Sequence, residues 1–99
     1  MNLYKADINS MREILFRWLN ADGDFVYGSL IYGIHSPIIH IGEHEWVHVY
    51  PNNIEQLIGR DMFGRRVFEG DTVITDGFIH KASFDDYKDL REGKAFKHE

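Results

Sequence analysis

The residues of this chain that most resemble a chemical site are His44, Glu45 and His48, in the run His44-Glu45-Trp46-Val47-His48. Their order matches the H-E-x-x-H motif of zinc hydrolases, in which both histidines bind zinc and the glutamate activates the metal-bound water. The chemistry requires a helix, because the two imidazoles reach one metal ion only when they lie one helical turn apart. The motif therefore predicts a zinc hydrolase only if this segment is helical.

The surrounding sequence favours a strand instead. Gly42 and Pro51 bracket only eight residues, and Trp46, Val47 and Val49 belong to types that are enriched in strands. Residues four apart in a strand are separated by about 13 Å, which is too far for two histidines to share a zinc ion. We interpret the match as accidental and predict no metal, cofactor or catalytic residue, with the zinc hydrolase as the alternative.

Other catalytic motifs are missing from the sequence. Gly59 and Gly64 have the spacing of a phosphate-binding loop, but Arg65-Arg66 follows them in place of Lys-Ser/Thr. There is no G-x-S-x-G nucleophile motif. The chain also has no cysteine, which excludes disulfides and thiolate metal sites. These absences favour a protein without enzymatic activity.

Composition limits the class of protein and of partner. The chain has 99 residues, 43% of them hydrophobic, and a net charge of −5. This length predicts one domain with a core of its own. The acidic balance weighs against double-stranded DNA and leaves single-stranded nucleic acid as a weaker alternative. The sequence contains no apolar run of membrane-spanning length and no apolar leader, so we expect a cytoplasmic protein.

One local group of basic residues stands out against this acidic background. It consists of Arg60, Arg65 and Arg66. Charge patterning favours solvated turn residues here, and contact with an anionic partner is the alternative.

The first patterned segment, residues 10–19, fits two structures. Ser10 and Glu13 form a capping box, and apolar residues follow at helical spacing, which predicts an amphipathic helix. Ile14, Phe16 and Trp18 also alternate as in a strand. The residue pattern alone favours the helix.

Short strands separated by glycine-marked turns are expected over most of the remaining chain. The expected strands cover residues 25–32, 38–41, 45–50, 65–68, 72–74 and 78–81. Residues 53–58 fit either a helical turn or a strand, and Gly28 indicates a bulge or a close approach of another backbone. Ser83 and Asp86 predict a capped helix over residues 84–91, ended by Gly93.

These elements predict a mainly β fold, a small antiparallel barrel-like domain with a short C-terminal helix. An α+β fold is the alternative. We expect residues 1–10 to be an N-terminal extension, residues 11–93 to form the domain, and residues 94–99 to be frayed.

Residues 11–75 resemble the YopX family of phage and prophage proteins. The likeness rests on residues 11–17 with residues 24–30, and on residues 51–73, which contain the Glu-Gly-Asp corner at 69–71. The residues that fit the family pattern in the second block are Gln56, Gly59, Asp61, Gly64, Val67, Phe68, Glu69, Gly70, Asp71 and Val73. The chain departs from the pattern at Met62-Phe63, where the family is polar, and in the 25 residues after Ile74.

The resemblance implies a barrel-like β fold, a strand over residues 13–18 in place of the helix, and no activity that can be transferred. It also implies a phage or prophage accessory protein in the bacterial host cytosol. The most distinctive signature residues, Gln56, Gly59, Gly64, Glu69, Gly70 and Asp71, are expected to be structural, since tight turns require glycine.

The predicted function is therefore binding of a protein partner or self-association. The apolar residues Trp46, Met62 and Phe63 are the candidates for contact, because exposed apolar side chains often mark interfaces.

Overall fold

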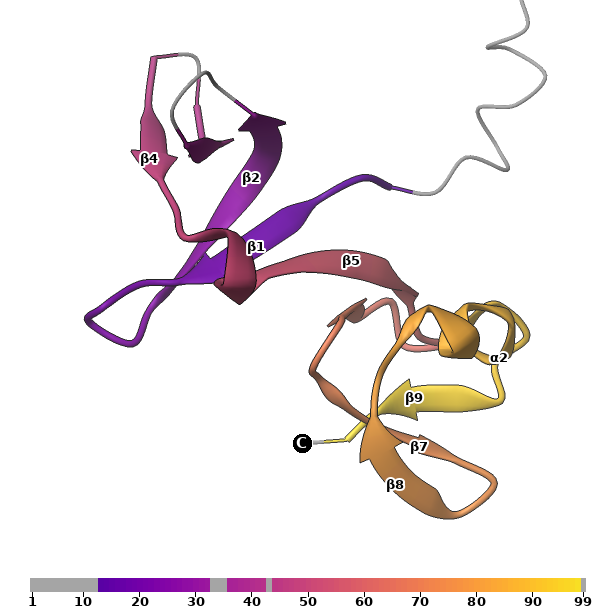
Figure 1. Ribbon diagram of the computed structural model, residues 1–99. Helices are drawn as coiled ribbons and strands as arrows, with labels where there is room; N and C mark the ends of the chain where they lie inside the picture. The colour runs from indigo at the N-terminus through magenta and orange to yellow at the C-terminus, as the bar shows by residue number, and fades with distance from the viewer. Residues whose placement is uncertain (1–12, 33–35, 43, 99) are drawn as a thin grey trace, which may run out of the picture.

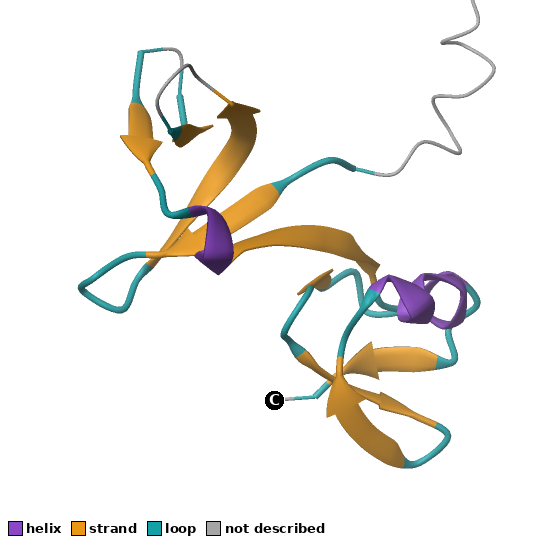
Figure 2. Cartoon of the chain, in the orientation of Figure 1, coloured by secondary structure: helices purple, strands orange, loops and turns teal. Residues whose placement is uncertain are grey.

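The structure is a computed structural model that describes residues 13–32, 36–42 and 44–98. The expected extension, residues 1–10, lies outside the described residues, as does Ser10 of the first capping box. Strands dominate the described part (Figures 1 and 2), so the predicted mainly β fold is confirmed. The one α-helix within the described residues, α2, covers only Tyr87–Arg91. No helix among the described residues is long and apolar enough to cross a membrane.

The strands form two antiparallel sheets. The first has six strands in the order β4-β3-β2-β1-β5-β6, and the second has three in the order β8-β7-β9. Those of the first are β1 (Phe16–Leu19), β2 (Phe25–Tyr32), β3 (Pro37–His40), β4 (Trp46–His48), β5 (Ile54–Arg60) and β6 (Arg66–Phe68). Those of the second are β7 (Thr72–Thr75), β8 (Phe78–Lys81) and β9 (Ala95–Lys97). Within the described ranges both sheets are open, and neither closes into the expected barrel.

β1 replaces the helix that its apolar spacing predicts. Its residues pair on both sides, so that Arg17 lies opposite Tyr27 of β2 and opposite Glu55 of β5. Two strand neighbours satisfy the backbone of β1 in extended form, and this tertiary pairing outweighs the local helical preference. The strand implied by the family resemblance is present, but it starts at Phe16 rather than at residue 13.

Residues 53–58, for which the sequence fitted either a helical turn or a strand, begin at the last residue of a helical turn and continue as a strand. A 3-10 turn, η1, covers Pro51–Asn53, and β5 begins at the next residue, Ile54. Proline in the first turn lacks the N–H that a helical start leaves unpaired, which suits it to this position.

The predicted capped helix near the C-terminus is confirmed in modified form. The Ser83 side chain accepts from the N–H of Asp85, and the Asp86 carboxylate accepts from the N–H of Ser83. The helix begins as a 3-10 turn, η2 (Phe84–Asp86), before it continues as α2. α2 ends at Arg91 with Glu92 as its C-cap, and Gly93 follows with a φ of 77°, in the left-handed region.

The prediction of a frayed C-terminus is wrong for β9. Ala95, Phe96 and Lys97 pair with β7, and Ala95 is fully buried. The backbone N–H of Lys97 also donates to the Asp61 carboxylate. β9 follows the residue that ends the helix and is only three residues long. A pattern this short does not indicate that the segment pairs with β7.

The main core lies in the C-terminal half of the molecule. Its buried residues come from β5, β6, the second sheet, α2 and the loop after β8: Ile58, Val67, Val73, Ala82, Leu90 and Ala95. In Figure 1, β2 and β4 extend away from the second sheet and α2. The radius of gyration is 15.2 Å, against about 13 Å for a compact domain of 100 residues. The β1–β4 part is therefore a layer of sheet outside the main core.

Candidate functional site

The H-E-x-x-H segment does not form the helix that its chemistry needs. Trp46 and His48 belong to β4, as predicted, and His44 lies in a bend before it. Within residues 13–32, 36–42 and 44–98, no group of three or more His, Cys, Asp or Glu residues could hold a metal ion. His48 instead shares a 2.9 Å hydrogen bond with Ser36, between Nδ1 and Oγ.

A row of large apolar side chains lies on one face of β1–β4. Register and the alternation of strand residues place them together, since Leu19 lies opposite Phe25, and Arg17 opposite Tyr27. We call this surface the aromatic face; it consists of Leu19, Phe25, Tyr27, Ile31 and Trp46. Each of these residues exposes between 39% and 56% of its surface.

The other face of the same strands is better covered. Ile39 of β3 is completely buried, and Val26, Leu30 and Val47 are partly buried. In the described structure, Phe68 of β6 contacts the aromatic face at Tyr27, and all five residues of this face stay at least 39% exposed.

An ion-pair centre joins β1 and β5 to the corner between β6 and β7. Arg17 of β1 is 5% exposed. Its Nε donates to Oε1 of Glu55 at 2.8 Å, and its Nη2 donates to Oδ1 of Asp71 at 2.9 Å. The guanidinium also lies 4.2 Å from the ring centre of Phe25 and 4.6 Å from that of Phe68. Planar stacking of this kind suits arginine, which is more weakly hydrated than lysine.

The Glu-Gly-Asp corner is the other half of this centre. Asp71 accepts from the N–H of Phe68 as well as from Arg17, and Glu69 accepts from the N–H of Gln56 through its side chain. Gly70 has a φ of 86°, and a Cβ there would collide with the Glu55 carboxylate. These contacts of Glu69, Gly70 and Asp71 fix the path of the backbone through the turn between β6 and β7.

Of the other signature positions, Gly59 and Gly64 also have structural surroundings. A Cβ at Gly59 would touch the ring of Tyr87 at 3.6 Å, and Gly64 has a φ of 79° in the turn between β5 and β6. At the same turn, Met62 and Phe63 are 62% and 65% exposed.

All three basic residues around this turn have carboxylate partners within the chain. Arg60 and Arg66 both contact Glu13, and the hydrogen bond from Arg66 holds the pKa of Glu13 below its usual value. Arg65 contacts the buried Asp61 at 2.8 Å. Burial raises the pKa of Asp61, but hydrogen bonds led by those from the N–H groups of Lys97 and Arg65 lower it overall. This geometry explains the arginine group without an external anion.

His80 and Asp86 form a further pair, 2.8 Å apart between Nε2 and Oδ1. The hydrogen bond to Asp86 raises the pKa of His80 above its usual value. A raised pKa means that protonated His80 stabilises the fold. This contribution is complete below the ordinary pKa of about 6.5 and disappears as the pH rises through the raised value.

We therefore expect His80→Gln to lower the free energy of unfolding at pH 5.5 and to cost progressively less towards pH 9. Urea unfolding of both proteins across this range measures the difference. A cost that stays constant with pH would contradict the pairing.

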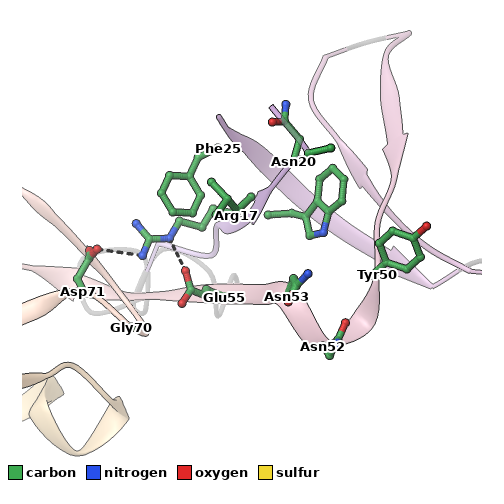
Figure 3. A pocket seen from close by; sticks show the side chains of 12 residues that line it. Arg17, Asn20, Phe25, Tyr50, Asn52, Asn53, Glu55, Gly70 and Asp71 are labelled. Carbon is green, nitrogen blue, oxygen red and sulfur yellow. Dashed lines mark hydrogen bonds and ion pairs between the residues drawn. The ribbon is translucent and has the colours of Figure 1, made fainter. Parts of the chain in front are cut away.

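A cleft of about 710 Å³ opens where β1 runs past the start of β5. The end of β1 with Asn20 forms one side, and Tyr50 with η1 forms the other (Figure 3). The Arg17 ion-pair centre lies at one end of this view, and Tyr50 at the opposite end. The rings of Trp18 and Tyr50 are 6.4 Å apart and inclined by 46°.

No protein-family model matches the chain, and neither curated proteins nor solved structures gave a significant match. The resemblance to the YopX family accordingly stays a prediction.

Sequence reasoning missed the ion-pair centre and the cleft. The one available signal was Arg17 itself, a charge between Phe16 and Trp18 in an apolar run. Its two carboxylate partners are 38 and 54 positions further along the chain. Nothing local to β1 identifies them.

Proposed function

We propose that this domain is a non-enzymatic module that self-associates through the aromatic face, as a phage or prophage accessory protein. The observation that carries the proposal is the exposed aromatic face of β1–β4. A sheet with an apolar face is stable when that face packs against a second layer. Two sheets packed face to face supply such a layer.

The size of the aromatic face fits an interface. Large side chains of this kind have roughly 150–250 Å² of surface each. At the observed exposures, the five residues leave about 500 Å² of apolar surface, which is the size of the largest and often functional patch on a typical monomer. A standard interface uses about 800 Å² per partner, so this patch can form most of its centre.

Charge selects the kind of partner. The five residues carry no charge, and the bordering charges of Arg17 and Glu55 are paired with each other. A nucleic acid or an anionic membrane surface requires unpaired cations, which this face does not offer. Interface centres between proteins are rich in aromatic residues and poor in charge. Two copies of a chain of net charge −5 repel least where they meet at an uncharged surface.

Replacing Ile31 and Trp46 by lysine together tests the proposal. We expect the wild-type protein to form dimers at micromolar concentration and the double variant to stay monomeric, because each dimer would bury four unpaired charges. Size exclusion with light scattering and sedimentation velocity measure the mass.

Phe78→Lys is the matched control. Phe78 is 75% exposed and lies on β8 of the other sheet, so its replacement should leave the dimer intact. A wild-type protein that is monomeric at all concentrations would reject self-association. Loss of the dimer in the control alone would place the interface elsewhere.

A further inference from the structure

We propose that the cleft between β1 and η1 binds a neutral saccharide. The cleft borders the aromatic face and shares Leu19 and Phe25 with it, but the residues that carry this proposal, Tyr50 and those of η1, do not belong to that face. The volume of about 710 Å³ is within the usual range for small-ligand sites, roughly 300–1,000 Å³.

The aromatic side chains of the cleft suit a sugar ring. Tyr50 is 71% exposed and presents an open aromatic platform beside Trp18. The C–H face of a sugar packs on a single aromatic ring as apolar surface. A flat nucleobase would gain most by lying parallel between two rings, and the inclination of 46° does not allow that.

The polar side chains suit hydroxyl groups. Asn20, Asn52 and Asn53 all line the cleft. The carbonyl oxygen of Asn20 already accepts from the N–H groups of Asp22 and Asp24, which leaves its NH2 group as donor. The exposed side-chain amides of Asn52 and Asn53 have no hydrogen-bond partner in the described chain. Each amide both donates and accepts, as a sugar hydroxyl does.

Charge excludes an anionic ligand. Arg17 is the one cation among the described residues that line the cleft, and it is paired with both Glu55 and Asp71. Lys97 also contacts Asp71, at 3.8 Å, so the cations around this centre are paired with its carboxylates. A phosphate or carboxylate ligand would meet no free cation here. The Asp71 carboxylate already accepts hydrogen bonds from Arg17 and from the N–H of Phe68. A neutral ligand avoids both conflicts.

Trp18 adds an unpaired donor at this site. Its Nε1 is buried and has no acceptor within the described residues. Buried N–H groups normally have a partner, which in such sites is water or a ligand oxygen. A ligand hydroxyl that enters when the exposed Tyr50 ring shifts would supply one.

Tryptophan fluorescence tests the proposal in a Trp46→Phe background, which leaves Trp18 as the single tryptophan. The probes are maltotriose, cellotriose and chitotriose, with adenosine and glucose 6-phosphate as comparators. We expect at least one trisaccharide to change the fluorescence saturably and both comparators to bind more weakly.

Tyr50→Ala should weaken this binding by about tenfold or more, because it removes the open platform. Tyr32→Ala is the matched control: Tyr32 is 72% exposed on β2, outside the cleft. No response to any trisaccharide, tighter binding of a comparator, or equal losses in the two tyrosine variants would each overturn the proposal. Sedimentation of the wild-type protein, which keeps Trp46 in the aromatic face, measures self-association separately, so the failure of one proposal can be told from the failure of the other.

Discussion

Arg17→Met is expected to lower the free energy of unfolding by about 3–5 kcal/mol, the range for removing one partner of a buried ion pair. The substitution keeps an unbranched apolar stem between Phe25 and Phe68. It leaves Glu55 without its cation and Asp71 with only the longer contact of 3.8 Å to Lys97. Since a domain of this size is stable by only about 5–15 kcal/mol, the variant should lose a large part of its stability.

Denaturant unfolding followed by circular dichroism measures the loss, and Arg66→Gln is the control. Arg66 also makes an arginine–carboxylate contact of 2.9 Å, to Glu13, but its side chain is 46% exposed. Exposed pairs contribute about 0–1 kcal/mol, so the control should be nearly as stable as the wild type. Equal losses in both variants would show that burial does not decide the strength of these pairs.

The same centre can be tested by restoring its balance of charge. Adding Glu55→Gln and Asp71→Asn to Arg17→Met removes both carboxylates but keeps an oxygen that can accept from the N–H of Phe68. We expect the triple variant to be more stable than Arg17→Met alone, since replacing all members of a buried ionic group is less costly than removing one. Simple additivity would mean that the three residues act independently.

Local sequence patterns predicted the strands that follow turn residues. β2 and β8 follow Asp-Gly turns, and both strands are rich in β-branched and aromatic residues. The short helix was marked by its own capping residues, Ser83 and Asp86. In each case the determining interaction joins residues close in sequence, which a reading of the chain can recognise.

The elements that local patterns alone did not predict depend on partners far away in the chain. β1 has helical spacing but is extended because β2 and β5 pair with it, and β9 is ordered because β7 lies beside it. The candidate site is similar, because the cleft is formed by β1 and η1 together. Its residue types were visible in the sequence, but their proximity follows from the register of β1 against β5.

The ion-pair centre also links stability to the proposed interface. The Tyr27 ring lies 6.0 Å from that of Phe25 and 5.6 Å from that of Phe68. Phe25 and Phe68 are the two rings that enclose the Arg17 guanidinium. A loss of Arg17 should therefore disturb one end of the aromatic face. The position of Trp46 at the other end depends instead on the pairing of β4 with β3 and of β3 with β2.

Gly28→Ala tests that attachment, and we expect it to cost about 3 kcal/mol. A Cβ at Gly28 would collide with the backbone carbonyl oxygen of His40 and approach the Ile39 side chain to 2.9 Å. Backbone cannot move aside as the end of a flexible side chain can, so β3 must shift away from β2. Overpacking of this kind typically costs 1–3 kcal/mol and occasionally more.

Gly42→Ala is the control for Gly28→Ala. The nearest atom to a Cβ at Gly42 is 4.0 Å away, so this variant should stay within about 0.5 kcal/mol of the wild type. Hydrogen exchange should locate the loss in Gly28→Ala, with faster exchange in β3 and β4 than in the core strand β7. Because β3 and β4 position Trp46, the same variant should also dimerise less. Normal exchange in β3 and β4 would show that the sheet absorbs the methyl group, and the aromatic face would then depend less on this close approach.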